Sequence, residues 1–175
     1  MMAKFSESIP EETRQAMVKH KTPQEQAERY AYRNENDKFY MPSSCILRLL
    51  RESAGNHKMR GTRKSAKYAV PGAISVQPDC LLLTNGDGKT EIDQFGVDSR
   101  SVVIPSTKGR IMCHRPKFSN WSLKMTIHID DEILPPDFVK QILTEGGKRQ
   151  GIGAFRPSCG GAFGTFLISE WNEVK

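Results

Sequence analysis

The sequence has few of the residues, and none of the patterns, that mark secreted, membrane-spanning or zinc-bound proteins. Only four of its 175 residues are cysteines, and none is in a Cys-x-x-Cys pair or at finger-like spacing from a histidine. We therefore expect reduced thiols and no structural zinc. No apolar run reaches the roughly 18 residues of a membrane helix, and the N-terminus lacks a signal-peptide core. These absences predict an intracellular, cytoplasmic protein with no membrane partner, cofactor or metal.

Motifs for common enzyme chemistry are also missing. The sequence has no Gly-x-Ser-x-Gly elbow, HExxH motif, P-loop or EF-hand loop. The Gly-Ile-Gly at 151–153 follows a helical pattern, which is the wrong context for a dinucleotide fingerprint. The acidic run at 130–132 is more simply a helix lead-in than a metal site. We predict a binding protein without catalytic residues, and a nuclease that uses His114 or His128 is the weaker alternative.

Basic residues outnumber acidic ones by 26 to 20, which gives a net charge of +6 and an isoelectric point near 9.2. This excess suits a nucleic acid or an acidic protein partner. It is concentrated between Arg48 and Lys67, where seven cations accompany one acid, Glu52. The interleaved Gly, Thr and Ser predict a loop that contacts phosphates, and a solvated loop is the alternative. The loop cations are Lys58, Arg60, Arg63, Lys64 and Lys67.

A second basic stretch, from Lys108 to Lys124, combines five cations with two aromatic residues and contains no acid. Cations beside aromatic rings suit nucleic acid, because a ring can stack on a base. We predict that Arg115 and Lys117 line a binding groove and that Phe118 stacks on a base. Trp121 is interpreted as a core anchor at the head of a strand.

The segment from Gly146 to Phe166 holds seven glycines and three cations, and no acid. Glycine at this density permits positive φ angles and close backbone approach. We interpret the segment as a surface that lays backbone N–H groups and cations against a polyanion; a structural connection with special turns is the alternative. The predicted contacts are Lys148, Arg149 and Arg156, with the backbone of Gly151, Gly153, Gly160, Gly161 and Gly164.

Capping residues and apolar spacing predict an α+β fold. The expected helices cover 23–33, 44–54 and 135–145, and the expected strands cover 38–41, 73–84, 101–104, 109–115, 121–129 and 163–171. The pair Gly146-Gly147 is expected to end the third helix. Residues 1–22 would form a polar arm, and residues 23–175 a single α+β domain whose sheet is covered by helices on one face.

Three segments, in order, resemble a family of small proteins from bacteriophages and prophages: KTPQEQAERYAYRNENDKFYMPSSCILRLLRESAG, RPKFSNW and GGKRQGIGAFRPSCGGAFGTFLI. The helix start at Pro42-Ser43-Ser44 and the late Gly-rich loop are also similar, more loosely, to RAMP proteins, the ferredoxin-like RNA-binding subunits of CRISPR effector complexes. The resemblance implies a ferredoxin-like (RRM- or RAMP-like) antiparallel sheet with a C-terminal Gly-rich loop. It also implies the cytoplasm of a phage-infected or lysogenic bacterial host.

These observations predict a phage-type protein that binds single-stranded RNA or DNA through its backbone and could polymerise along a strand. Binding of this kind falls steeply with salt. The alternative from another class is a phage protein–protein module, either an anti-CRISPR-like inhibitor of a host defence complex or a virion assembly component. Its cations would then meet an acidic partner.

Overall fold

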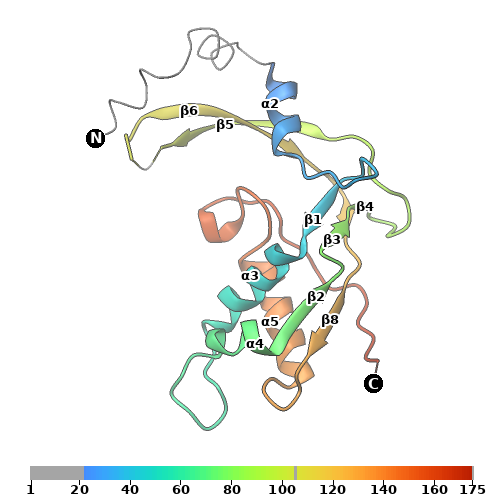
Figure 1. Ribbon diagram of the computed structural model, residues 1–175. Coiled ribbons are helices and arrows are strands. Elements are labelled where there is room, and N and C mark those ends of the chain that lie inside the picture. Colours follow the sequence, from blue (N-terminus) through green and yellow to red (C-terminus); the bar gives the residue numbers. More distant parts are fainter. Residues whose placement is uncertain (1–21, 105, 175) are drawn as a thin grey trace, which may run out of the picture. The chain divides into compact units, whose positions relative to one another are not determined.

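The computed structural model describes residues 22–104 and 106–174, which divide into two compact units (Figure 1). Unit 1 contains the described residues up to Ala31 and those from Gln94 to Ser119, and unit 2 contains the rest. The predicted arm, 1–22, lies outside the described residues apart from Thr22, and the single domain over 23–175 stays a prediction. No helix within 22–104 and 106–174 combines the length and apolar character needed to cross a membrane.

Unit 1 consists of helix α2 (Pro23–Tyr30) and an antiparallel hairpin of β5 (Gly96–Val103) and β6 (Arg110–Lys117). A capping box begins α2: the Thr22 hydroxyl accepts from the N–H of Glu25, whose carboxylate accepts from the N–H of Thr22. The helix packs on both strands and buries Ala27. The prediction that the strand over 109–115 ends at Arg115 is wrong. Proline is tolerated at an edge, so β6 continues through Pro116.

Unit 2 is built on two helices that lie side by side, α3 (Ser43–Ala54) and α5 (Pro136–Arg149) (Figure 1). Apolar residues at helical spacing form the core between and beside them. The largest fully buried apolar residues of the two helices are Ile46, Leu49, Leu50, Val139 and Ile142. The short helices η2 (Ala66–Tyr68) and α4 (Val70–Ala73) follow α3, and η3 (Pro157–Cys159) follows α5.

The predicted end of α5 at Gly146-Gly147 is wrong, because the helix continues to Arg149. Both glycines are buried. A Cβ on Gly146 would lie 2.5 Å from Cδ2 of Leu49, and one on Gly147 would lie 2.7 Å from the carbonyl oxygen of Phe166. The two glycines therefore let neighbouring segments approach the helix closely and do not end it.

The strands of unit 2 pair antiparallel in twos. β1 (Tyr40–Pro42) pairs with β3 (Cys80–Leu82), β2 (Ile74–Gln77) with β8 (Thr126–Ile129), and β4 (Thr84–Asn85) with β7 (Trp121–Ser122). The alternation predicted over 121–129 is present, since its odd-numbered residues pack on the core, but 123–125 interrupt the strand. The strand predicted over 163–171 is wrong: these residues form no ladder with the described chain. The class, α+β with small antiparallel sheets, is confirmed.

Candidate nucleic-acid interface

Residues 57–67, here called the basic loop, follow α3 and end within η2, and backbone hydrogen bonds close the loop. The N–H of Met59 donates to the carbonyl of Lys64, and the N–H of Ala66 donates to the carbonyl of His57, both at 2.9 Å. Lys58 and Ser65 form an isolated β-bridge. Ala66 is buried and Met59 packs on the core. The base of the loop is thereby fixed and its tip extends into solvent.

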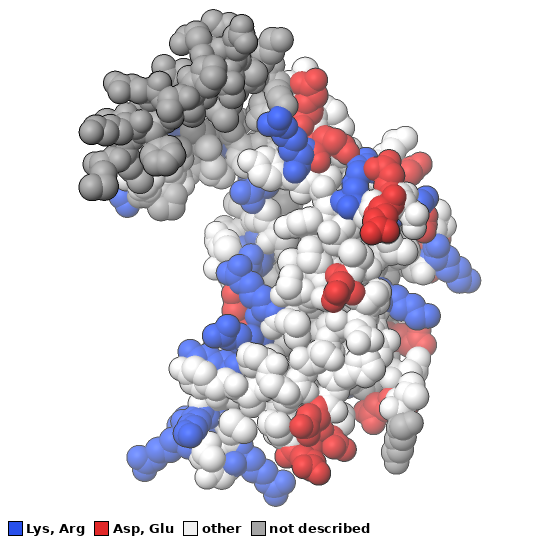
Figure 2. Space-filling model, in the orientation of Figure 1, with Lys and Arg blue, Asp and Glu red and all other residues white. Residues whose placement is uncertain are grey.

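The tip of the basic loop carries four exposed cations within seven residues, namely Lys58, Arg60, Arg63 and Lys64. Within the part of the chain that the structure describes, none of them forms an ion pair. Lys and Arg side chains gather on this side of unit 2, over α3 and the loop that follows it (Figure 2). Dense cations without local counter-charges attract polyanions.

His57 ties the base of the basic loop to α5. Its Nε2 lies 2.8 Å from Oε2 of Glu145, and its ring meets Phe138 edge-on at 5.5 Å between centroids. The side-chain amide of Gln141 donates to the other carboxylate oxygen of Glu145 at 2.9 Å. The hydrogen bonds from Gln141 and His57 lower the pKa of Glu145 below its usual value of 4.5, and the charge of Arg149 adds to this effect.

We expect acid to remove the stabilisation that Glu145 provides. Because its pKa is lower in the folded chain, the carboxylate stabilises the fold above its unfolded-state pKa, and this contribution is lost as pH falls through the folded pKa. Urea unfolding at about pH 7 and about pH 3 tests this. Glu145→Gln should be less stable than the wild type at the higher pH, and the difference should narrow at the lower one.

The matched control is Glu132→Gln. Glu132 is exposed, and its carboxylate forms no hydrogen bond or ion pair with the described chain. This variant should have the same free energy of unfolding as the wild type at both pH values. A Glu145→Gln deficit of equal size at both pH values would show that the carboxylate charge is not responsible.

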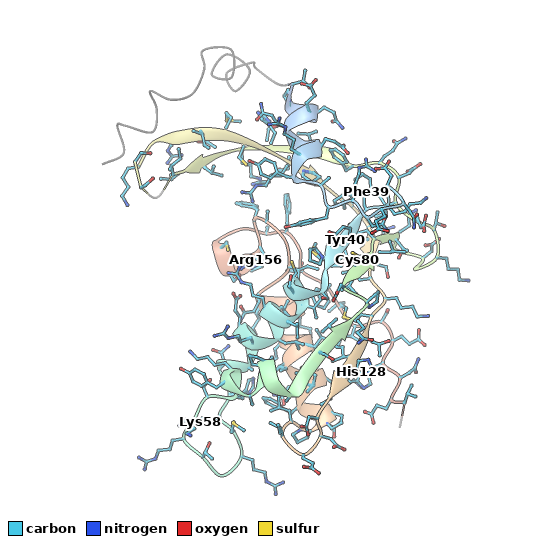
Figure 3. All side chains as sticks on the ribbon, viewed as in Figure 1. Phe39, Tyr40, Lys58, Cys80, His128 and Arg156 are labelled. Atoms are coloured by element: carbon cyan, nitrogen blue, oxygen red, sulfur yellow. The ribbon has the colours of Figure 1, made fainter. Side chains whose placement is uncertain are left out.

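Arg156 fastens the Gly-rich segment to α3 (Figure 3). Its guanidinium donates to the Gly153 carbonyl at 3.1 Å and to the Ser158 hydroxyl at 2.7 Å. It also lies 3.7 Å from the carboxylate of Glu52, which pairs with Arg48 at 2.7 Å. The Arg156 side chain is only 13% exposed, so most of its donors serve the chain itself. In contrast, Lys148 and Arg149 are exposed in the last turn of α5.

The glycines of the segment mainly allow it to fold back on itself. The N–H of Ile152 donates to the Gly164 carbonyl at 2.9 Å. A Cβ on Gly164 would overlap the carbonyl of Ile152, and one on Gly161 would overlap the carbonyl of Phe155. Positive φ angles occur at Gly151, Gly153, Gly160 and Gly164. These contacts favour the structural-connection alternative for this backbone, since the segment's own carbonyls already account for glycine at 161 and 164.

The remaining predicted contacts belong to unit 1. Arg115 and Lys117 are exposed on β6, and Nε of Arg115 donates to the sulfur of Cys113 at 3.2 Å. Phe118 is half-buried, with its ring centroid 6.1 Å from that of Phe95. The interface built from the basic loop is therefore a feature of unit 2 alone.

The two histidines considered for nuclease chemistry lie in different units. Nδ1 of His114 is 2.7 Å from the Ser99 hydroxyl, and Nε2 of His128 is 3.3 Å from the side-chain oxygen of Gln77. Across residues 22–104 and 106–174, no group of three or more His, Cys, Asp or Glu could hold a metal ion. All four cysteines are free thiols.

Tyr68, the last residue of η2, is not among the residues that the sequence predicts for the site. It is 68% exposed, and Nζ of Lys67 lies 4.9 Å from the centroid of its ring. The available signal was a cation followed by an aromatic residue at the end of a basic run. The structure adds that the ring stands in solvent beside that run.

Comparisons with known proteins assign no family to the chain. No family model, no curated protein and no solved structure matches it.

Proposed function

We propose that the protein binds single-stranded RNA or DNA by holding its phosphate backbone against the basic loop. The observation that carries this proposal is the set of four exposed cations, unpaired within the described chain, on a loop with a fixed base. Phosphate contacts supply affinity without reading sequence. Arg149, exposed in the last turn of α5, adds a cation one helical turn after Glu145, the partner of His57 at the base of the loop.

The proposal includes a phage origin, a cytoplasmic site of action and a RAMP-like, ferredoxin-like core. The element order supports such a core: β1, α3 and β2 are followed later by β8 and α5, and β2 pairs antiparallel with β8. A ferredoxin-like unit runs strand, helix, strand, strand, helix, strand, so β2 and β8 take the places of its second and third strands. The pairing of β1 with β3 and the unpaired segment at 163–171 depart from that pattern. Polymerisation along a bound strand is part of the same proposal.

Charge reversal on the loop tests the proposal. Fluorescence anisotropy with single-stranded RNA, single-stranded DNA and duplex would be measured at about 50 and 200 mM salt. The wild type should bind the single strands and lose affinity steeply at the higher salt. The double variant Arg63→Glu/Lys64→Glu should bind about tenfold or more weakly. Its thermal stability should be unchanged, because both side chains are exposed.

The matched control reverses two exposed cations of unit 2 outside the basic loop, Lys89 and Lys124. Lys89→Glu/Lys124→Glu changes the net charge equally, so it should retain most of the affinity. Equal losses in both double variants would show that net charge, and not the basic loop, attracts the strand. Wild-type binding that ignores salt, or no binding, would overturn the proposal, and strand cleavage would favour a nuclease.

A protein–protein module is the second candidate. The observation that favours it lies in unit 1, where Val103, Ile111 and Met112 are 48%, 49% and 55% exposed near the turn of the β5–β6 hairpin. In the register of the hairpin, Val103 and Met112 share one face and Ile111 lies on the other. Exposed apolar side chains that share a face are typical of contact surfaces. An inhibitor of a host defence complex (an anti-defence role) or a virion assembly component would use such a surface.

A further inference from the structure

We infer that Tyr68 is the base-stacking residue of the interface, so that the site selects unpaired strands over duplex. This inference rests on the proposed function and adds a chemical preference to it. The loop cations hold phosphates, while the tyrosine ring takes the face of one base. The sequence predicts stacking by Phe118, whose ring lies against Phe95 in unit 1.

The backbone that carries Tyr68 is held in place by its neighbours. Ala66 and Val70, two residues away on either side, are each only 1% exposed. The Ser65 hydroxyl accepts from the N–H of Lys67 at 3.4 Å and donates to the Gly55 carbonyl at 3.2 Å. The turn is thus held by the core and by the end of α3, while Tyr68 is 68% exposed.

Lys67 gives the ring a charged neighbour. Its ammonium lies over the ring at 4.9 Å from the centroid, within the range of a cation–π contact. An ammonium on one face of a ring leaves the opposite face open to an aromatic partner. The same ammonium places positive charge beside any base stacked there, near the phosphates that flank it.

A stacking tyrosine separates single strands from duplexes, because only a single strand has base faces free to stack on it. Unpaired bases can turn out and stack on an aromatic side chain, whereas paired bases are already stacked on their neighbours. Base–aromatic stacking tolerates every base, since each has a π face. The basic loop supplies affinity for any phosphate backbone, and Tyr68 adds affinity only for a strand with free bases.

The experiment compares three labelled probes of about 16 nucleotides, a length that covers the larger single-strand sites. They are a single-stranded oligonucleotide, the same oligonucleotide with abasic residues, and the duplex, each prepared as DNA and as RNA. Tyr68→Ala should weaken binding of the intact single strand about five- to 160-fold. It should barely change binding of the abasic strand or the duplex. Tyr68→Phe keeps the ring and should bind like the wild type.

Tyr30→Ala is the matched control, because Tyr30 is 58% exposed but belongs to unit 1; it should bind like the wild type. Unchanged affinity of Tyr68→Ala for the intact strand would overturn the inference, as would an equal loss on the duplex or abasic probe. If Arg63→Glu/Lys64→Glu weakens binding while Tyr68→Ala does not, the proposed function survives without the stacking role. Absence of wild-type binding at low salt would remove both.

Discussion

Replacing Gly164 with alanine should destabilise the protein by about 2–4 kcal/mol. Gly164 has a φ of +72°, which costs an L-residue about 1 kcal/mol. The added Cβ would also overlap the carbonyl oxygen of Ile152, which is backbone and cannot rotate away. Overpacking of this kind costs typically about 1–3 kcal/mol more. The hydrogen bond from the N–H of Ile152 to the Gly164 carbonyl would be lost as the segment shifts.

Gly160→Ala is the control, because Gly160 has nearly the same φ, +76°, with nothing within 4 Å of its Cβ position. It should cost only about 1 kcal/mol, the backbone part of the penalty. Urea denaturation of both variants measures the difference. Equal costs at the two sites would mean that φ alone determines the penalty and that the contact with Ile152 is unimportant.

Gly146→Ala should destabilise the protein by up to about 2 kcal/mol, although alanine is normally the better helix residue. Alanine gains up to about 1 kcal/mol over glycine within a helix. At position 146 its Cβ would lie 2.5 Å from Cδ2 of Leu49, which is only 2% exposed and so closely surrounded. The two helices would have to separate, and the cost of overpacking exceeds the gain in helix propensity.

Gly72→Ala provides the opposite case. Gly72 lies in α4, with nothing within 4 Å of its Cβ position, so this variant should be more stable by about 0.4–1 kcal/mol. Leu49→Ala adds a further test, because it removes the atoms that Gly146→Ala would meet. The double variant should be less destabilised than the sum of the two single variants. If the free-energy costs of the two single variants simply add, the Cβ at position 146 does not clash with Leu49.

The sequence predicts the helices well where local signals determine them. The capping box of Thr22 and Glu25 is complete within four residues, and the apolar spacing of Ile46, Leu49 and Leu50 defines the buried face of α3. The end of α5 could not be predicted in this way. The sequence does not distinguish a glycine pair that ends a helix from one that leaves room for Leu49 of another helix.

The alternation over 163–171 predicts a strand that the structure lacks, for a related reason. Phe166 and Ile168 pack against the core while Leu167 is 74% exposed, which reproduces the period of a strand. Periodicity reports which side chains are buried, whereas a strand also needs a partner for its backbone. In this segment the N–H of Phe166 donates to the Gly147 carbonyl, but the segment forms no ladder with the described chain.

In the candidate site too, the sequence predicts what depends on neighbouring residues and not what depends on contacts between remote segments. Lys58, Arg63 and their neighbours stand exposed, as a polar basic loop predicts. Arg156 also reads as a free cation from its own neighbours in the sequence. Its partner Glu52 is more than 100 positions earlier, so only folding reveals that its charge is largely engaged.

The self-contact of the Gly-rich segment restricts how its length can vary. The carbonyls of Ile152 and Phe155 fix the spacing to Gly164 and Gly161, so an inserted residue near either would force them apart. The exposed turn at Gly160 falls under the same restriction, because it lies between Phe155 and Gly161 and its N–H donates to the carbonyl of Pro157. An epitope or a fluorescent peptide would therefore need a site outside residues 152–164 to leave this segment intact.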